Sequence, residues 1–362
     1  MDRGKKPGRF LGAMNSKIYL DLKDIIREHA LPFLPAKSLF RFTGVCRDWK
    51  LQISTPFFAH NQSNSFRTIS GLFCQVPGDP PSFISLDPKA CGVPDPSLTF
   101  LPDQVDVRAS SNGLLCCEGR TGEKAFYICN PVSKQWKKLP KPNANHGPDS
   151  AIVLIFEPSL LNFVADYKLV CAFPSVDFDN GYEFEIYSSA EESWKISGEI
   201  CFGNRKLLPR SGVHVKGVVY WMTKNGSSIV AFDLMKERSQ LLYGSYGSSL
   251  GVMHGKLCLV SVSRQLLVVN VLSNVYSNTM VMNSNAKTWE EKLRIPLSND
   301  AVPGGISYDQ ALVVFAGSDV VVVQAGRSVF SIDIKTKESA VLCSAADHDV
   351  RIIAYVNSLV YF

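Results

Sequence analysis

A serine flanked by glycines is the first pattern in this chain that could do covalent chemistry. The segment Gly247-Ser248-Ser249-Leu250-Gly251 fits Gly-x-Ser-x-Gly, in which a serine nucleophile lies on a sharp turn from a strand into a helix, and His254 lies close by. The residues that follow, 256–260, are apolar and β-branched and predict a strand instead of the required helix. We therefore expect Ser249 to lie in a loop between strands and not to act as a nucleophile.

Metal and redox chemistry needs histidines, cysteines or carboxylates at defined spacings. The six histidines do not fall at metal-ligand spacing, and the ten cysteines include no Cys-x-x-Cys pair. The segment Asp177-Phe178-Asp179-Asn180-Gly181 lacks the glutamate of a calcium-binding loop and predicts a hairpin turn. The sequence thus predicts no metal, no cofactor and no disulfide framework. Cys116 and Cys117 are neighbours on a predicted strand, so we expect one to be buried and the other partly exposed.

Composition restricts the class of protein that must position these residues. The chain has 362 residues, of which 46% are apolar and 20% charged, which is typical of a soluble globular protein with about two domains. Its apolar runs are much shorter than the roughly 20 residues of a membrane-spanning helix, and no apolar stretch of signal-peptide length follows the charged start. We therefore expect no membrane association, and a location in the nucleus, the cytoplasm or both.

Positive charge is concentrated at the start of the chain. Residues 1–60 contain eleven Lys or Arg against five Asp or Glu, whereas the net charge of the whole chain is only +5. Residues 1–16 are typical of a basic flexible tail. A basic first segment on a nearly neutral body predicts an acidic partner, which charge alone leaves open between nucleic acid and an acidic protein surface.

Between residues 17 and 60 the apolar residues follow a helical period. Leu22, Ile25, Ile26 and Ala30 share one face of a first helix that Asp21 can cap. Two further short helices are predicted, over 36–42 after a proline and over 45–51. Three short helices form only a marginal core, so we expect a partner to cover their surplus apolar side chains. The alternative is that these side chains pack on the chain's own second domain.

Residues 66–362 follow the period of strands. Short apolar runs alternate with turn residues, and a loose pattern recurs in which a strand ends at Asn130, Tyr187, Asp233, Asn270 or Asp333. These positions are 57, 46, 37 and 63 residues apart, close on average to the length of a four-stranded propeller blade. We expect an all-β, propeller-like domain, with a two-sheet β-sandwich as the alternative. A strand over 352–355 is expected to close the ring against residues near 69–74.

Both regions resemble a known family. The order of Leu34-Pro35-Ala36-Lys37-Ser38-Leu39-Phe40-Arg41-Phe42, Val45-Cys46-Arg47-Asp48-Trp49-Lys50 and Ser54-Thr55-Pro56-Phe57-Phe58 is similar to that of an F-box. The segments Ser111-Asn112-Gly113-Leu114-Leu115, Cys129-Asn130-Pro131 with Trp136, and Gly217-Val218-Val219-Tyr220-Trp221 resemble the kelch-like F-box-associated region of plant F-box proteins.

The resemblance implies a substrate receptor of an SCF-type ubiquitin ligase. Its F-box would bind a Skp-type adaptor, and through it a cullin, while the β-domain binds an unknown target protein; nucleic acid is then not a partner, and the chain is not itself an enzyme. The expected adaptor contacts are Leu22, Ile25, Ile26, Leu34, Pro35, Lys37, Leu39, Val45, Cys46 and Trp49. Lys37, Arg41 and Arg47 are expected to face an acidic adaptor. The competing class is an interaction protein outside any ligase, with a hydrolase or lectin-like enzyme as a third and weaker alternative.

Overall fold

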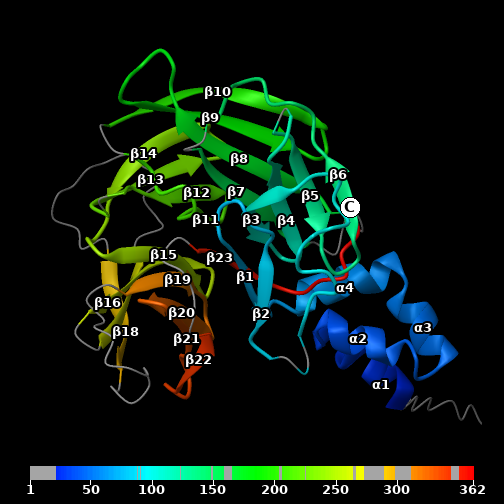
Figure 1. Cartoon of the computed structure of the whole chain (residues 1–362). Helices are drawn as coiled ribbons and strands as arrows, with labels where there is room; N and C mark the ends of the chain where they lie inside the picture. The colour runs from blue at the N-terminus through cyan, green and yellow to red at the C-terminus, as the bar shows by residue number, and fades with distance from the viewer. Residues whose placement is uncertain are drawn as a thin grey trace, which may run out of the picture.

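A helical region precedes a β-propeller in the computed structural model (Figure 1). The structure describes residues 22–362 except 88, 90, 123, 148–149, 159–164, 204–205, 225, 264–265, 273–288, 298–310 and 344–349. The basic tail and Asp21, the expected cap of the first helix, lie outside the described residues. The helical elements are α1 (Leu22–His29), η1 (Leu31–Phe33), α2 (Ala36–Phe42), α3 (Arg47–Ile53) and α4 (Pro56–Ser65).

The helical region contains one long helix more than the sequence pattern predicts. The three expected helices are present as α1, α2 and α3, and α4 follows them directly. Pro56, although a proline often ends a helix, occupies the first turn of α4, where it costs no hydrogen bond. The Thr55 hydroxyl accepts a hydrogen bond of 3.1 Å from the backbone N–H of Phe58 and so caps this helix. Ser54-Thr55-Pro56 is therefore a helix start.

The rest of the described chain forms six antiparallel sheets. The first contains β2 (Ser82–Ser85), β1 (Gly71–Gln75) and β23 (Arg351–Tyr355). Two sheets follow with β3 (Val105–Ser111), β4 (Leu114–Gly119), β5 (Phe126–Asn130) and β6 (Gln135–Lys138), and with β7 (Ala151–Phe156), β8 (Tyr167–Pro174), β9 (Gly181–Ser188) and β10 (Ser193–Phe202).

The remaining three sheets have the same four-stranded order. They contain β11 (Val213–Val215), β12 (Val218–Met222), β13 (Ser228–Asp233) and β14 (Arg238–Tyr243); β15 (Ser248–Met253), β16 (Lys256–Ser263), β17 (Leu266–Leu272) and β18 (Trp289–Pro296); and β19 (Leu312–Ala316), β20 (Val320–Ala325), β21 (Ser328–Asp333) and β22 (Ser339–Cys343).

These sheets are the six blades of a closed propeller (Figure 1). The inner strands β23, β3, β7, β11, β15 and β19 contact one another in that order around the ring. The ring is closed by pairing of β1 with β23, in a register that places Gly71 opposite Tyr355 and Gln75 opposite Arg351. The expected propeller and its closing strand are therefore confirmed. The sandwich alternative is wrong, because the strands form six separate sheets whose innermost strands contact one another around a ring.

The recurring strand ends of the sequence pattern mark one position in five successive blades. Asn130, Tyr187, Asp233, Asn270 and Asp333 all lie at or near the end of the third strand of a blade. In two of them, Asp233 and Asp333, the carboxylate accepts hydrogen bonds of 2.8–3.0 Å from backbone N–H groups two and three residues later. The short polar side chain therefore stabilises the turn into the outer strand.

The expectation for Cys116 and Cys117 is wrong. Both side chains are fully buried, Cys116 in the core between the second and third blades and Cys117 in the core that the second blade shares with the first. A propeller blade packs against a neighbour on each of its two faces, so the second strand of a blade, such as β4, has no solvent side. The alternation of faces on β4 is present, but both faces are covered.

The helices pack on the propeller through a shared core. Leu31, Ala36 and Leu39 belong to one buried cluster with Phe73 of β1 and Leu115 of β4. Their side chains are at most 1% exposed. The inner layer of the helical region is therefore continuous with the core of the first two blades.

A buried glutamine of α4 fixes this contact. The side-chain amide of Gln62 donates to the carbonyl oxygens of Leu34, at 3.2 Å, and Asn357, at 3.4 Å. Its oxygen accepts a hydrogen bond of 3.0 Å from the backbone N–H of Leu359. One side chain thus connects α4, the segment after η1 and the segment that follows β23.

The segment after β23 runs between the helices and the blades. Asn130 donates from its side chain to the carbonyl oxygens of Ser358 and Val360, both at 3.0 Å. Gly113 has φ +96°, and a Cβ there would lie 2.2 Å from the Cβ of Ser358. Only glycine fits this close approach, which explains the Asn112-Gly113 turn of the sequence pattern.

Candidate partner-binding site

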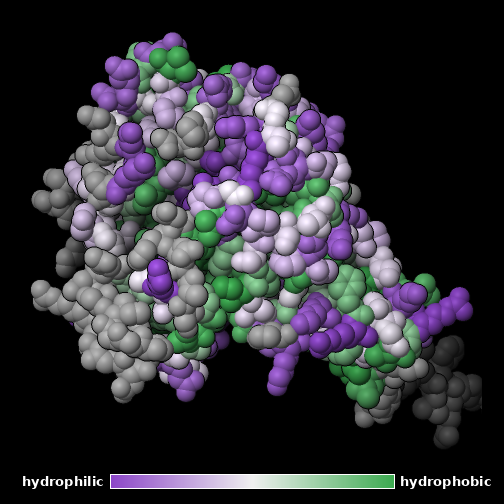
Figure 2. Space-filling model, viewed as in Figure 1, coloured by the Kyte–Doolittle hydropathy of each residue, from purple (hydrophilic) through white to green (hydrophobic). Residues whose placement is uncertain are grey.

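The outer layer of the helical region exposes large apolar side chains. Seven of them are between 41% and 68% exposed: Leu22, Ile25, Phe33, Phe40, Val45, Leu51 and Phe57. Figure 2 shows hydrophobic side chains gathered on this region, at the lower right of the molecule. Large exposed apolar groups at this density are typical of a protein interface. We call these seven residues the outer apolar face.

The helix α1 shows how one segment serves both layers. Leu22 and Ile25 are three residues apart, so they share a face, and both are exposed. Ile26 points about 100° away and is half-buried against the shared core. The apolar stripe of α1 is therefore wider than the surface that the chain itself covers. Ile26 lies on the covered part, and Leu22 and Ile25 lie on the uncovered part.

The predicted adaptor contacts fall into three groups in the structure. The exposed group is Leu22, Ile25, Val45 and Cys46; the half-buried group is Ile26, Leu34, Lys37 and Trp49; the buried group is Pro35 and Leu39. Buried side chains of the third group can support a partner site only from within. The role of all ten residues in adaptor binding stays a prediction.

Cys46 and Trp49 have a structural task of their own. The Cys46 sulfur accepts a hydrogen bond of 3.4 Å from the backbone N–H of Trp49 and caps α3. The ring of Trp49 packs on Phe42 with a centroid distance of 5.5 Å and so connects α3 to α2. These residues hold the turn that presents Val45.

Two of the three expected rim cations point to the propeller. The Lys37 ammonium donates to the carbonyl oxygen of Cys91 at 3.2 Å, and the Arg41 guanidinium donates to that of Lys89 at 3.0 Å. Both carbonyls belong to the loop that follows β2. These side chains therefore tie α2 to its own chain, and Arg47, which is exposed, is the one member of the trio that no such bond engages.

Four members of the outer apolar face were missed by sequence reasoning: Phe33, Phe40, Leu51 and Phe57. Each lies one or two positions along the chain from a buried apolar residue: Leu39 directly precedes Phe40, and Phe58 directly follows Phe57. In such runs periodicity indicates that a helix is apolar but not which neighbour faces solvent. The signal that could have found them is the surplus of apolar residues itself.

The Gly-x-Ser-x-Gly segment has no nucleophile geometry. Ser249 lies within β15, paired with Val260, and not in a loop as expected. His254 lies in the turn at the far end of that strand, five residues or about 17 Å along it. Gly251 has a packing role, because a Cβ there would lie 2.4 Å from the Cβ of Ala316 on the next inner strand.

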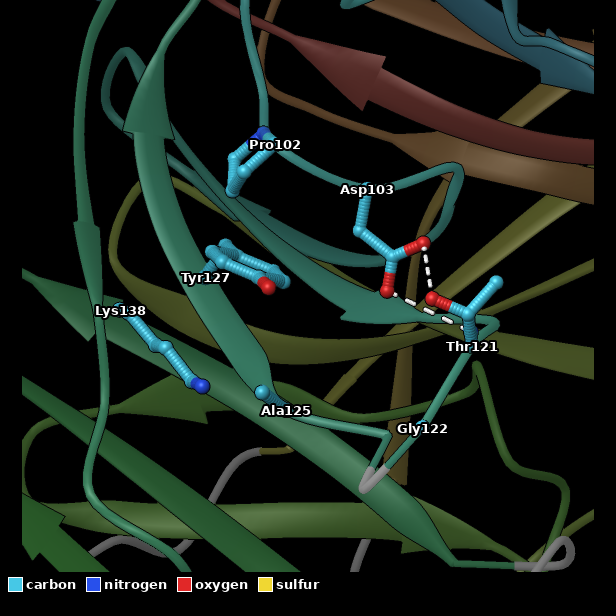
Figure 3. A pocket seen from close by; sticks show the side chains of 7 residues that line it. All are labelled: Pro102, Asp103, Thr121, Gly122, Ala125, Tyr127 and Lys138. Carbon is cyan, nitrogen blue, oxygen red and sulfur yellow. Dashed lines mark hydrogen bonds between the residues drawn. The ribbon is translucent and has the colours of Figure 1, made fainter.

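A shallow cavity of about 270 Å³ lies at the edge of the second blade, between Pro102, Asp103, Thr121, Gly122, Ala125, Tyr127 and Lys138 (Figure 3). Asp103 accepts a hydrogen bond of 2.8 Å from the Thr121 hydroxyl, so this carboxylate already has a partner. Burial and the charge of Asp103 raise the pKa of the Tyr127 hydroxyl, which therefore stays protonated at neutral pH. The arrangement contains no paired nucleophile and base.

Within the described ranges no three His, Cys, Asp or Glu side chains lie together in a way that could hold a metal ion. Among the described helices none combines the length and apolar character needed to cross a bilayer. The expected hairpin turn around Asp177 is confirmed, since this segment connects β8 with β9.

The sequence pattern of the F-box associated beta propeller domain matches residues 94–362. This match covers most of the chain and begins in the segment before β3, so the helices and the first two strands lie outside it. Curated relatives extend the similarity toward the helices.

Two F-box proteins of Arabidopsis thaliana are similar along much of the chain. The F-box protein At5g49610 is 27% identical over 291 residues, which cover 75% of this chain and 78% of the relative. The F-box protein At5g07610 is 28% identical over 322 residues, which cover 82% of this chain and 74% of the relative. The second alignment is longer than residues 94–362 and so includes part of the preceding segment. A solved nidogen/laminin complex has a chain with a TM-score of 0.43 at 10% identity, covering 79% of this chain and 98% of that one, and supports no conclusion.

Proposed function

The chain belongs to the plant F-box proteins that carry an F-box-associated β-propeller domain, and from that premise we propose that it is the substrate-recognition subunit of an SCF-type ubiquitin ligase. The helical region binds a Skp-type adaptor, and the propeller binds the target protein. The chain has no catalytic role of its own in this proposal. It works in the nucleus, the cytoplasm or both.

The outer apolar face is the observation that carries the adaptor half of the proposal. Its side chains come from every described helix. The exposed charges on α1 and α3 are of both signs, since Arg27 pairs with Asp24 and Glu28, and Asp48 lies between Arg47 and Lys50. A surface of apolar anchors edged by charges is complementary to an apolar groove with charged edges. The inner layer is already used by the propeller, so the outer face is free to bind a second protein.

The contact between the helices and the propeller supports the target-binding half of the proposal. Gln62 and the tie from Arg41 hold the two parts in one orientation. A target held by the propeller then has a restricted position relative to the adaptor. Such tethering raises the effective concentration of target lysines near the ubiquitin carrier, which is how a receptor accelerates transfer without active-site residues.

The adaptor half is tested by charge placed on the outer apolar face. We expect the double variant Ile25→Asp, Val45→Asp to bind a purified Skp-type adaptor at least about 30-fold more weakly in calorimetry, because two buried carboxylates would lack partners. The matched control is Val176→Asp, Met235→Asp, which changes two propeller side chains that are 87% and 94% exposed. Equal affinity of both double variants would contradict the proposal.

A second measurement distinguishes a subunit of a ubiquitin ligase from an interaction protein that acts outside a ligase. The full chain with adaptor is mixed with a cullin and passed over a size-exclusion column. Co-elution of all three supports the proposal. Adaptor binding without cullin recruitment would favour the alternative.

A further inference from the structure

Four arginines gather where the inner strands of the propeller begin. Arg108 lies on β3 and Arg351 on β23, while Arg120 follows β4 and Arg210 precedes β11. The Arg108 guanidinium lies 2.6 Å from a carboxylate oxygen of Glu118. It also donates to the carbonyl oxygen of Ser150, just before β7, at 2.9 Å.

One carboxylate serves two of these arginines. Asp106 accepts hydrogen bonds from Arg120, at 2.9 Å, and from Arg351, at 3.1 Å. We call the four arginines with Asp106 and Glu118 the arginine cluster. It holds four guanidinium groups and two carboxylates, so its charge at neutral pH is positive.

Arg210 is the unpaired member. It forms neither a hydrogen bond nor an ion pair with any other residue that the structure describes. Its side chain is exposed. Partial desolvation and the charges of Arg351 and Arg108 lower the pKa of its guanidinium to about 10, against the opposing charge of Asp106, so it is still charged at neutral pH. An exposed cation with like charges nearby is accessible to an incoming anion, which would offset them.

The backbone around Arg210 reaches the inner wall of the ring. Two residues later, a Cβ on Gly212 would lie 2.2 Å from Val153 of β7. The same strand begins after Ser150, to which Arg108 is bonded. Strands β3, β7, β11 and β23 lie together at the middle of the ring in Figure 1, so the cluster lies among the inner strands of these four blades.

The cluster lies on the side of the ring away from the helices. Ser70, which follows α4, donates to the carbonyl oxygen of Tyr355 at the end of β23, whereas Arg351 begins that strand. Arg351 and Tyr355 are four residues apart along β23, or about 13 Å. A ligand at the cluster would not compete with a protein on the outer apolar face.

We propose that Arg210, with Arg108 and Arg351 beside it, binds an anionic group, carboxylate or phosphate, on an exposed segment of a protein docked at this end of the ring. The inference deepens the proposed function, on whose target-binding half it rests, by naming the chemistry of the bound segment. Guanidinium groups suit both anions because their donors match two oxygens at once.

The surroundings favour a protein segment over nucleic acid. The loop between β8 and β9 lies on the same side of the ring, since Ala151, at the start of β7, pairs with Ala172, near the end of β8. Asp177 and Asp179 in that loop are exposed. A nucleic-acid site would need an extended positive track, which these carboxylates interrupt.

The test uses the full chain and three labelled 12-residue Gly/Ser peptides with four central phosphoserines, four glutamates or four serines, together with a 12-nucleotide poly-uridine RNA. We expect anisotropy to show binding of either charged peptide, or both, at least about tenfold tighter than the serine peptide. Arg210→Gln should remove this preference. The control Arg327→Gln, an exposed arginine in the turn between β20 and β21 on the same side of the ring, should keep it.

Each alternative result overturns the inference. If Arg210→Gln and Arg327→Gln bound the charged peptides equally well, Arg210 would have no specific role in binding. If the wild type bound the serine peptide as tightly as the charged peptides, the site would not recognise negative charge. Tighter binding of the RNA than of both charged peptides would assign the cluster to nucleic acid. Binding of the adaptor, measured on the same preparations, reports separately on the proposed function.

Discussion

The helices and the propeller treat apolar side chains in opposite ways. Seven large apolar residues are exposed within the 44 residues of 22–65, whereas the much longer described part of the propeller exposes eleven. In the propeller, each blade covers both faces of its neighbours, so even adjacent residues such as Cys116 and Cys117 are buried. The helices have the propeller on one side only.

This difference shows that exposure follows from the number of neighbours an element has. A blade in a closed ring has two, and its strands can be apolar on both faces without penalty. A helix layer on the ring has one, and its outer apolar residues are left for another protein. The same residue types therefore stabilise the fold in one region and indicate binding in the other.

The largest effect is expected from a tryptophan inside the ring. Trp221 is fully buried beside Phe184, with a ring centroid distance of 5.9 Å. Trp221→Ala should lower the free energy of unfolding by about 3–5 kcal/mol, because it leaves a cavity between two blades. Urea denaturation measures this. In Trp136→Ala, a residue 43% exposed on an outer strand, the loss should be much smaller, and similar losses would contradict the contrast.

An intermediate effect is expected where the two regions meet. Gln62→Leu removes the hydrogen bonds to Leu34, Asn357 and Leu359 and leaves their buried backbone groups unpaired, which should cost about 2–3 kcal/mol. Hydrogen exchange should accelerate in α4 and in 356–360 but not in the far blades. Gln52→Leu, whose side chain bonds no other described residue, should leave exchange unchanged.

A smaller effect is expected from pH. His60 in α4 is 2% exposed, and burial lowers its pKa below the usual value of about 6.5. As pH falls below that value the unfolded chain takes up a proton that the folded chain binds less well, so stability is present at pH 7.5 and declines toward pH 5.

The measurement is the free energy of unfolding at pH 7.5 and 5.5. Each unit of pKa difference is worth about 1.4 kcal/mol. The decline should be less steep in His60→Gln, though not absent, because burial also lowers the pKa of His214. An unchanged slope in His60→Gln would show that this histidine does not carry the effect.

The smallest effect is expected on the outer apolar face itself. Leu22→Ser and Phe57→Ser, at residues 68% and 61% exposed, should each change the free energy of unfolding by less than about 0.5 kcal/mol while weakening adaptor binding. Thermal melting and calorimetry on the same preparations check both halves. A large loss of stability would mean that these side chains hold the fold together.

The propeller was predictable because its information is local and repeated. A polar acceptor at the end of the third strand forms the same turn in two blades, as Asp233 and Asp333 show, and 352–355 carries the apolar pattern of a closing strand. The helix α4 was not predictable from periodicity. Its buried positions include the polar residues His60, Gln62 and Ser63, and Gln62 bonds to Asn357 and Leu359, almost 300 residues away.

The outer apolar face was predictable as a surplus but not residue by residue. Leu22, Ile25 and Val45 are exposed as a partner site requires, whereas Leu39 is taken by the shared core. Lys37 and Arg41 bond to the loop after β2, which no local pattern could indicate. What a sequence cannot show is which side of a short helix its own chain already covers.

Because Gln62 bonds to Leu359, the final position of the helices depends on residues that are synthesised last. The helices leave the ribosome early, but the partners that seat them, β23 and residues 357–359, appear only after five blades have been made. A nascent chain that stalls before residue 351 has an open ring, and its helices lack the bonds to residues 357–359 while keeping their contacts with the first two blades. The orientation of the helices relative to the ring is therefore completed only when the last strand is made.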